Sequence, residues 1–122
     1  MAINFGSNRP WGAVSQTEYR RMARDPRHDR VYRLHFAAIG WANQIGRSDF
    51  KGERLAEILV DKNGVIPDSQ NVSKAIRKAK SMGLIGADSK AACLVLPSSM
   101  FQKASVGGRT CSAHNVSGRT AA

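Results

Sequence analysis

The fold of this chain is constrained most by one amphipathic segment without acidic residues, residues 69–82. At about 100° per residue, its apolar side chains fall on one helical face, namely Val72, Ala75, Ile76, Ala79 and Met82. The opposite face is polar and basic and carries Gln70, Ser73, Lys74, Arg77 and Ser81. Asp68 can cap the start of such a helix, with Ser69 as the competing choice, and Gly83 can end it. The pattern therefore predicts a helix that buries one face and exposes a basic one.

The exposed face carries side chains of the types that recognise DNA. Arginine has the hydrogen-bond geometry for guanine, glutamine for adenine, and serine for either base. We therefore expect contacts to base edges from Gln70, Ser73, Lys74 and Arg77. Phosphate contacts are expected from polar and basic residues beside them, namely Asn71, Lys78, Lys80, Ser81 and Lys90. The alternative is a solvated helix that is basic without binding DNA.

The segments on both sides of this helix have patterns of ordered structure. Downstream, residues 84–96 hold two short apolar runs separated by a turn-forming stretch, which predicts a β-hairpin. Upstream, residues 51–60 have the periodicity of a helix. Residues 61–67 then form a connector that is longer than the usual turn of a helix-turn-helix. The predicted order is helix, connector, basic helix and hairpin.

A longer helix is expected over residues 26–45, with Asp25 as its N-cap and Gly46 after its end. One apolar stripe of this helix consists of Val31, Leu34, Ala38, Trp41 and Ile45, and a second consists of Tyr32, Phe36 and Ile39. The first stripe should pack against the helix pair. The second needs another cover, either residues 11–24 or the same face of a second copy in a homodimer.

A short helix opened by a capping-box pattern is expected over residues 15–24. The densest cluster of positive charge starts within this helix and continues beyond it. It comprises Arg20, Arg21, Arg24, Arg27, Arg30 and Arg33. These side chains either form local ion pairs on a solvated face or provide further phosphate contacts, for which Arg20, Arg21 and Arg24 are the candidates.

Residues 27–96 resemble a winged helix-turn-helix DNA-binding domain, and more narrowly the small helix-turn-helix proteins of actinobacteria and their bacteriophages. The stretches that carry the resemblance are WGAVSQTEYRR, DPRHDRVYRLHFAAIGWANQIG, FKGERLAEIL, VSKAIRKAKSMGLIG and CLVLP. The resemblance implies that residues 69–82 are the recognition helix and residues 87–92 the tip of the wing. It also implies a protein of a phage or mobile element.

Composition agrees with a nucleic-acid partner. The 122 residues include 19 Lys and Arg against 9 Asp and Glu, a net charge of +10, and a chain this basic commonly meets polyanions. Anionic membrane is the rival partner, but no apolar run approaches the length of about 18 residues of a membrane span. The N-terminus lacks the apolar region of a signal peptide, so the cytoplasm is the expected location.

No motif indicates catalysis, a cofactor or a metal site, so we expect a protein that is not an enzyme. The predicted fold is mainly α with a small β-hairpin. It comprises an N-terminal arm (residues 1–14), a winged helix-turn-helix domain with an N-terminal helical extension (residues 15–100) and a disordered C-terminal tail (residues 101–122). The predicted function is sequence-specific binding of double-stranded DNA as a transcriptional regulator. The alternatives are a winged-helix module that binds a host protein, and a replication or excision accessory factor.

Overall fold

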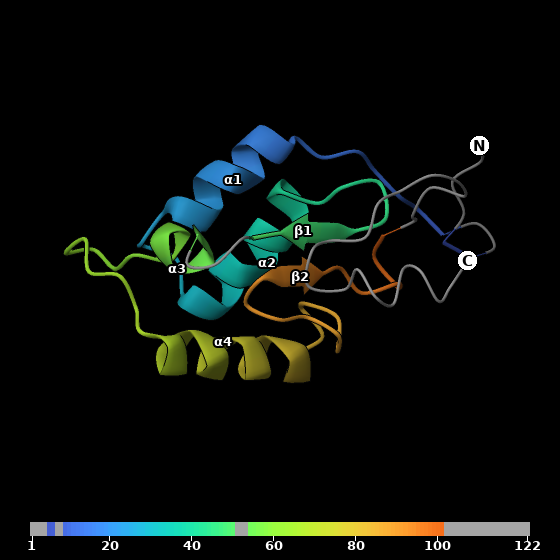
Figure 1. The fold of residues 1–122 in the computed structure, drawn as a ribbon. Helices are drawn as coiled ribbons and strands as arrows, with labels where there is room; N and C mark the ends of the chain where they lie inside the picture. Colours follow the sequence, from blue (N-terminus) through green and yellow to red (C-terminus); the bar gives the residue numbers. More distant parts are fainter. Residues whose placement is uncertain (1–4, 7–8, 51–53, 102–122) are drawn as a thin grey trace.

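The computed structural model describes residues 5–6, 9–50 and 54–101 and has four helices and one small sheet (Figure 1). The elements in chain order are α1 (Gln16–Arg24), α2 (Arg30–Gly40), β1 (Arg47–Asp49), α3 (Arg54–Ile58), α4 (Ser69–Ser81) and β2 (Cys93–Val95). The prediction of a small, mainly α protein is confirmed. Two predicted features, the tail after residue 101 and the first turn of the helix from residue 51, lie outside the described residues.

Helix α2 is the centre of the fold, with α1 on one side and α4 on the other (Figure 1). Its first predicted stripe contributes Val31, Leu34 and Ala38 to the core, where all three are buried. Phe50 and Leu94 are fully buried beside this helix and extend the core toward the sheet. The core therefore forms around α2, as the apolar periodicity predicts.

The predicted start of the long helix is wrong. Asp25 ends α1, because its backbone N–H donates to the carbonyl of Met22 at 3.1 Å. Its carboxylate is held by Arg27, whose side chain lies 2.7 Å away, and this hydrogen-bonded pairing keeps the pKa of Asp25 well below its ordinary value. Helix α2 begins only at Arg30 and ends at Gly40, five residues before the predicted end at Ile45. The local Asp25–Arg27 pair thus replaces the expected cap and first helical turn.

Helix α1 covers the second face of α2. The Ser15 hydroxyl accepts a hydrogen bond from the backbone of Glu18 at 3.3 Å, as the capping pattern predicts. The rings of Tyr19 and Phe36 meet edge to face, with their centroids 5.9 Å apart. Phe36 is accordingly partly buried by an intramolecular partner, whereas Tyr32 remains 43% exposed, so the expectation that Tyr32 is covered was wrong.

The close approach of these two helices depends on a glycine. A Cβ atom placed on Gly40 would lie 2.9 Å from the backbone nitrogen of Arg20. The carbonyl of Gly40 also accepts a hydrogen bond from Nε of Arg20 at 2.6 Å. Because no side chain separates the backbones here, the middle of α1 is held directly on the end of α2.

The sheet differs from the predicted hairpin. Strand β2 pairs antiparallel with β1, with Ser48 opposite Leu94, and residues 84–85 form no strand. Part of the hairpin remains, because the Gly86 N–H donates to the carbonyl of Val95 at 2.7 Å. Ser89, in the predicted exposed wing tip, is buried, and its hydroxyl accepts a hydrogen bond from the N–H of Val95 at 2.9 Å. The turn therefore folds back against β2.

A buried arginine joins three helices. Arg33 is only 2% exposed, and its Nε donates to the carbonyl of Ala23 at the end of α1. Its two terminal nitrogens donate at 2.8 Å to the carbonyls of Ile58 and Val60, where α3 ends. Arg33 thus satisfies carbonyls that have no helical partner, and it is neither a solvated side chain nor a phosphate contact.

Candidate nucleic-acid interface

Helix α4 has well-formed ends. The carboxylate of Asp68 accepts a hydrogen bond from the N–H of Asn71 at 2.8 Å, which confirms Asp68 as the N-cap. At the other end, the N–H of Leu84 donates to the carbonyl of Ala79 at 3.0 Å, and Gly83 has a φ of 72°. This arrangement is a Schellman motif, in which the left-handed conformation favours glycine. The two caps define a helix close to the predicted one.

The buried face of α4 agrees with the prediction at four of five positions. Val72, Ala75, Ile76 and Ala79 are buried, and α4 packs against α2 through this face. The fifth residue, Met82, is 46% exposed because it serves as the C-cap, where the helical rotation stops.

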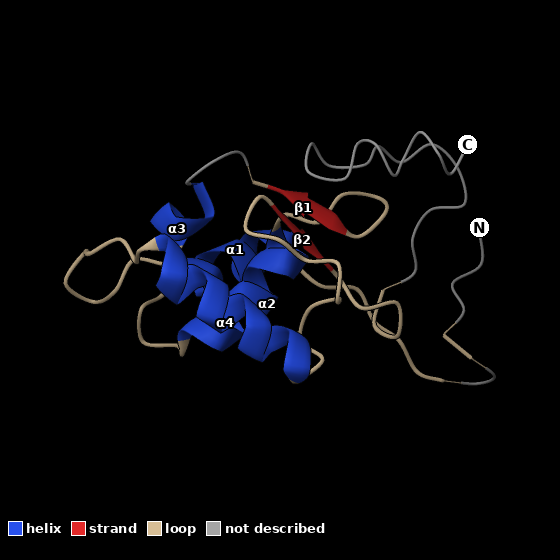
Figure 2. Cartoon of the chain, turned by 60° about the horizontal axis from the view of Figure 1, so that its bottom comes forward, coloured by secondary structure: helices blue, strands red, loops and turns tan. Residues whose placement is uncertain are grey.

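All four residues expected to read bases are exposed on the outer face of α4, namely Gln70, Ser73, Lys74 and Arg77. The residues expected to contact phosphates on the same helix are also exposed (Asn71, Lys78 and Ser81) or partly exposed (Lys80). The Ser81 hydroxyl already donates to the carbonyl of Lys78 at 2.7 Å, which leaves it an acceptor and a weaker choice for a phosphate. Figure 2 shows the outer side of α4 with no other element in front of it.

The outer face of α4 is strongly positive. It carries Lys74, Arg77, Lys78 and Lys80, and within the described ranges none of these side chains forms an ion pair with a carboxylate. Four cations on a helix of 13 residues are available to an external polyanion. Lys90 is exposed on the turn before β2 and adds a further cation outside the helix.

The connector before α4 is an ordered loop that presents two apolar side chains. The carboxylate of Asp61 accepts hydrogen bonds from the N–H groups of Asn63 and Val65, at 2.8 and 2.9 Å, and this keeps the pKa of Asp61 below its ordinary value. Val65 and Ile66 are 57% and 53% exposed. Sequence reasoning treated residues 61–67 only as a chain break, although Asp61 and Gly64 do signal a turn of this kind.

The arginines of α1 are not part of the same surface. Helix α1, which carries Arg20, Arg21 and Arg24, lies on the opposite side of α2 from α4 (Figure 1). The guanidinium groups of Arg20 and Arg24 lie over the ring of Trp41, at 5.4 and 5.0 Å from its centroid, and Arg21 pairs with Glu18 at 3.0 Å. Arg21 thus forms a local ion pair, as the alternative interpretation expects, whereas Arg20 and Arg24 contact an aromatic ring.

Comparison with known proteins adds no family, because no family model, no curated protein and no solved structure matches this chain. None of the helices in the described part of the chain combines the length and apolar character needed to cross a membrane. In the same part of the chain, no three His, Cys, Asp or Glu side chains gather as metal ligands would.

Proposed function

We propose that this protein binds double-stranded DNA with α4 in the major groove and is not an enzyme. The observation that carries the proposal is the division of α4 into two faces. One face packs against α2, and the other presents four unpaired cations together with exposed Gln70 and Ser73. A basic helix held rigidly at the surface of a small domain is the usual device for reading base edges.

The order of the elements supports a winged helix-turn-helix architecture. Helix α2, strand β1, helices α3 and α4, and strand β2 follow one another as in such domains, with α4 in the place of the recognition helix. Residues 86–92 would then be a short wing, and α1 an N-terminal helical extension. The role of a regulator of a phage or mobile element, acting in the cytoplasm of the host, rests on the sequence resemblance.

Within this proposal, Gln70, Ser73, Lys74 and Arg77 read bases, whereas Asn71, Lys78, Lys80 and Lys90 contact phosphates. Ser81 is the weakest phosphate candidate, because its hydroxyl already donates to the carbonyl of Lys78. Because α1 already covers Phe36, the second face of α2 requires no homodimer. A single copy can therefore present α4 to one DNA site.

The test is the salt dependence of binding to duplex DNA. The logarithm of the affinity should fall with the logarithm of salt concentration, with a slope of about −0.9 per phosphate neutralised. Lys78→Ala should flatten the slope by about one unit on every sequence. Arg21→Ala removes the same charge from the far side of α2 and is the matched control, so it should leave the slope nearly unchanged. Equal effects of the two variants would mean that net charge alone, and not the α4 face, attracts DNA.

A second candidate is favoured by the exposed pair Val65 and Ile66 beside the basic helix. An apolar pair next to cations would complement an acidic host protein that also exposes apolar side chains. Selection from random duplexes separates the candidates. A regulator and a replication or excision accessory factor both yield a defined motif, whereas a protein-binding module yields no enriched DNA sequence. Transcription from a promoter that carries the motif should then change with the regulator and not with the accessory factor.

A further inference from the structure

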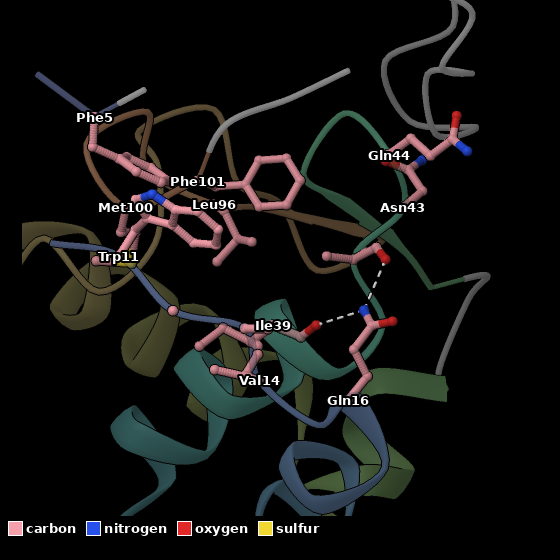
Figure 3. A pocket seen from close by; sticks show the side chains of 13 residues that line it. Phe5, Trp11, Val14, Gln16, Ile39, Asn43, Gln44, Leu96, Met100 and Phe101 are labelled. Carbon is pink, nitrogen blue, oxygen red and sulfur yellow. Dashed lines mark hydrogen bonds between the residues drawn. The ribbon is translucent and has the colours of Figure 1, made fainter. Parts of the chain in front are cut away.

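A large hollow lies away from the α4 surface, and nothing in the proposed function uses it. It opens between the N-terminal arm, the ends of α1 and α2, and the segment after β2, and it has a volume of about 820 Å³ (Figure 3). None of its lining residues belongs to α4. This volume falls in the range of about 300–1,000 Å³ that is typical of sites for small molecules.

The lining is mainly aromatic and aliphatic. Figure 3 shows the side chains of Phe5, Trp11, Met100 and Phe101 gathered along one side of the hollow with Leu96 beside them, and Ile39 across from them. Trp11 is 56% and Met100 is 41% exposed, although residues of these types usually bury most of their surface. Water in contact with these side chains would be released by an apolar ligand, which favours binding.

Hydrogen bonds and close packing fix the walls. The side-chain amide of Gln16 donates to the carbonyls of Ile39 and Ala42, both at 3.0 Å, and so ties the start of α1 to the end of α2 (Figure 3). On the other side, a Cβ atom placed on Gly46 would lie 2.9 Å from the Phe101 ring, so the ring rests directly on the glycine. Two sides of the hollow, at Gln16 and at Phe101, are therefore held in place, which lowers the cost of ordering a ligand there.

The charge beside the hollow is positive. A smaller adjoining hollow shares Phe5, Trp11 and Met100 with the first, and Arg9 lines it. Among the described residues that line the two hollows, none is acidic. A negatively charged group on a ligand would therefore meet an arginine and no carboxylate.

From this geometry we propose that the hollow binds a small aromatic molecule that carries one negative charge. The aromatic part lies between Trp11, Met100 and Phe101, and the anionic group points toward Arg9. The chain's own C-terminal segment is a poor occupant, because residues 102–122 contain no aromatic residue, leucine or isoleucine.

Two fluorescent probes of similar shape and different charge test the proposal. They are 1-anilinonaphthalene-8-sulfonate, which is an aromatic anion, and N-phenyl-1-naphthylamine, which is neutral. Calorimetric titration of the full chain should give saturable binding of one anionic probe per chain. Trp11→Ala should weaken both probes by about tenfold or more, because it removes the largest aromatic surface of the site. Arg9→Gln should weaken the anionic probe several-fold and leave the neutral probe nearly unchanged.

Ile66→Ala is the matched control, because Ile66 is also about half exposed, at 53%, but lies in the connector before α4. It should change neither affinity, and an unchanged midpoint of urea unfolding should show that each variant remains folded. The proposal is overturned by three results: no saturable binding of the anionic probe, equal binding by the Trp11→Ala variant, or equal losses for both probes with Arg9→Gln. Sedimentation that finds a dimer, dissociated by Trp11→Ala, would also overturn it by assigning the hollow to contact between two copies.

Discussion

Arg33 holds the ends of α1 and α3 on α2, and its replacement by methionine tests that arrangement. Three of its hydrogen bonds, to the carbonyls of Ala23, Ile58 and Val60, are 2.8 Å long. Hydrogen bonds from a charged donor contribute about 1.5–3 kcal/mol each, but the desolvation of a buried cation offsets several kcal/mol of this sum. Burial is also the main reason why the pKa of Arg33 lies below its ordinary value. We therefore expect Arg33→Met to lower the free energy of unfolding by about 2–4 kcal/mol.

Urea unfolding followed by circular dichroism measures this loss as a lower midpoint at an unchanged slope. Arg21→Met is the matched control, because Arg21 is exposed and forms only a surface ion pair with Glu18. The control should change the free energy of unfolding by about 0.5 kcal/mol or less. An Arg33→Met variant as stable as the wild type would refute the reasoning, since the desolvation cost of the cation would then equal or exceed its hydrogen bonds.

Three further predictions concern local features of the fold. Gly40→Ala should destabilise by about 1–3 kcal/mol in urea unfolding, because its methyl group would meet the Arg20 backbone, whereas a freely exposed helical glycine would gain from the change. Asp68→Ala should cost about 1 kcal/mol in a thermal melt through loss of the cap on Asn71, and an unchanged midpoint would contradict that role. The lowered folded-state pKa of Asp61 means that its contribution to stability is present above its unfolded pKa of about 3.9 and is lost as the pH falls through the folded value. As the pH is lowered, the free energy of unfolding of Asp61→Asn should therefore fall less steeply than that of the wild type. The same dependence on pH in both proteins would contradict this role of Asp61.

The elements whose ends and buried faces are determined by residues of the same segment could be predicted from the sequence. Helix α4 was predicted nearly to its ends because its apolar period, the Asp68 cap and Gly83 all lie within the segment itself. The same holds for the start of α1 at the Ser15 cap. Exposure of the predicted base-reading residues follows directly from that periodicity.

The features that depend on distant residues could not be predicted. Strand β1 has three residues and no alternating pattern, and it exists because β2, more than 40 residues later, pairs with it. Arg33 belongs to a run of arginines that are alike in sequence, and only the carbonyls at the ends of α1 and α3 make it a buried residue. The hollow beside Trp11 likewise forms from three segments far apart in the sequence, within residues 5–16, 39–44 and 96–101.

The central claim, that α4 reads DNA bases, is tested most directly at Arg77. Arg77 is exposed near the middle of the outer face, and its guanidinium can pair with O6 and N7 of guanine. Affinities of the wild type, Arg77→Ala and Arg77→Lys should be measured on the duplex obtained by selection and on random duplexes. Arg77→Ala should lose about 1–3 kcal/mol on the selected site and less on random DNA, and Arg77→Lys should lose specificity more than affinity. Equal losses on all sequences, or no binding of the wild type to any duplex, would contradict the claim.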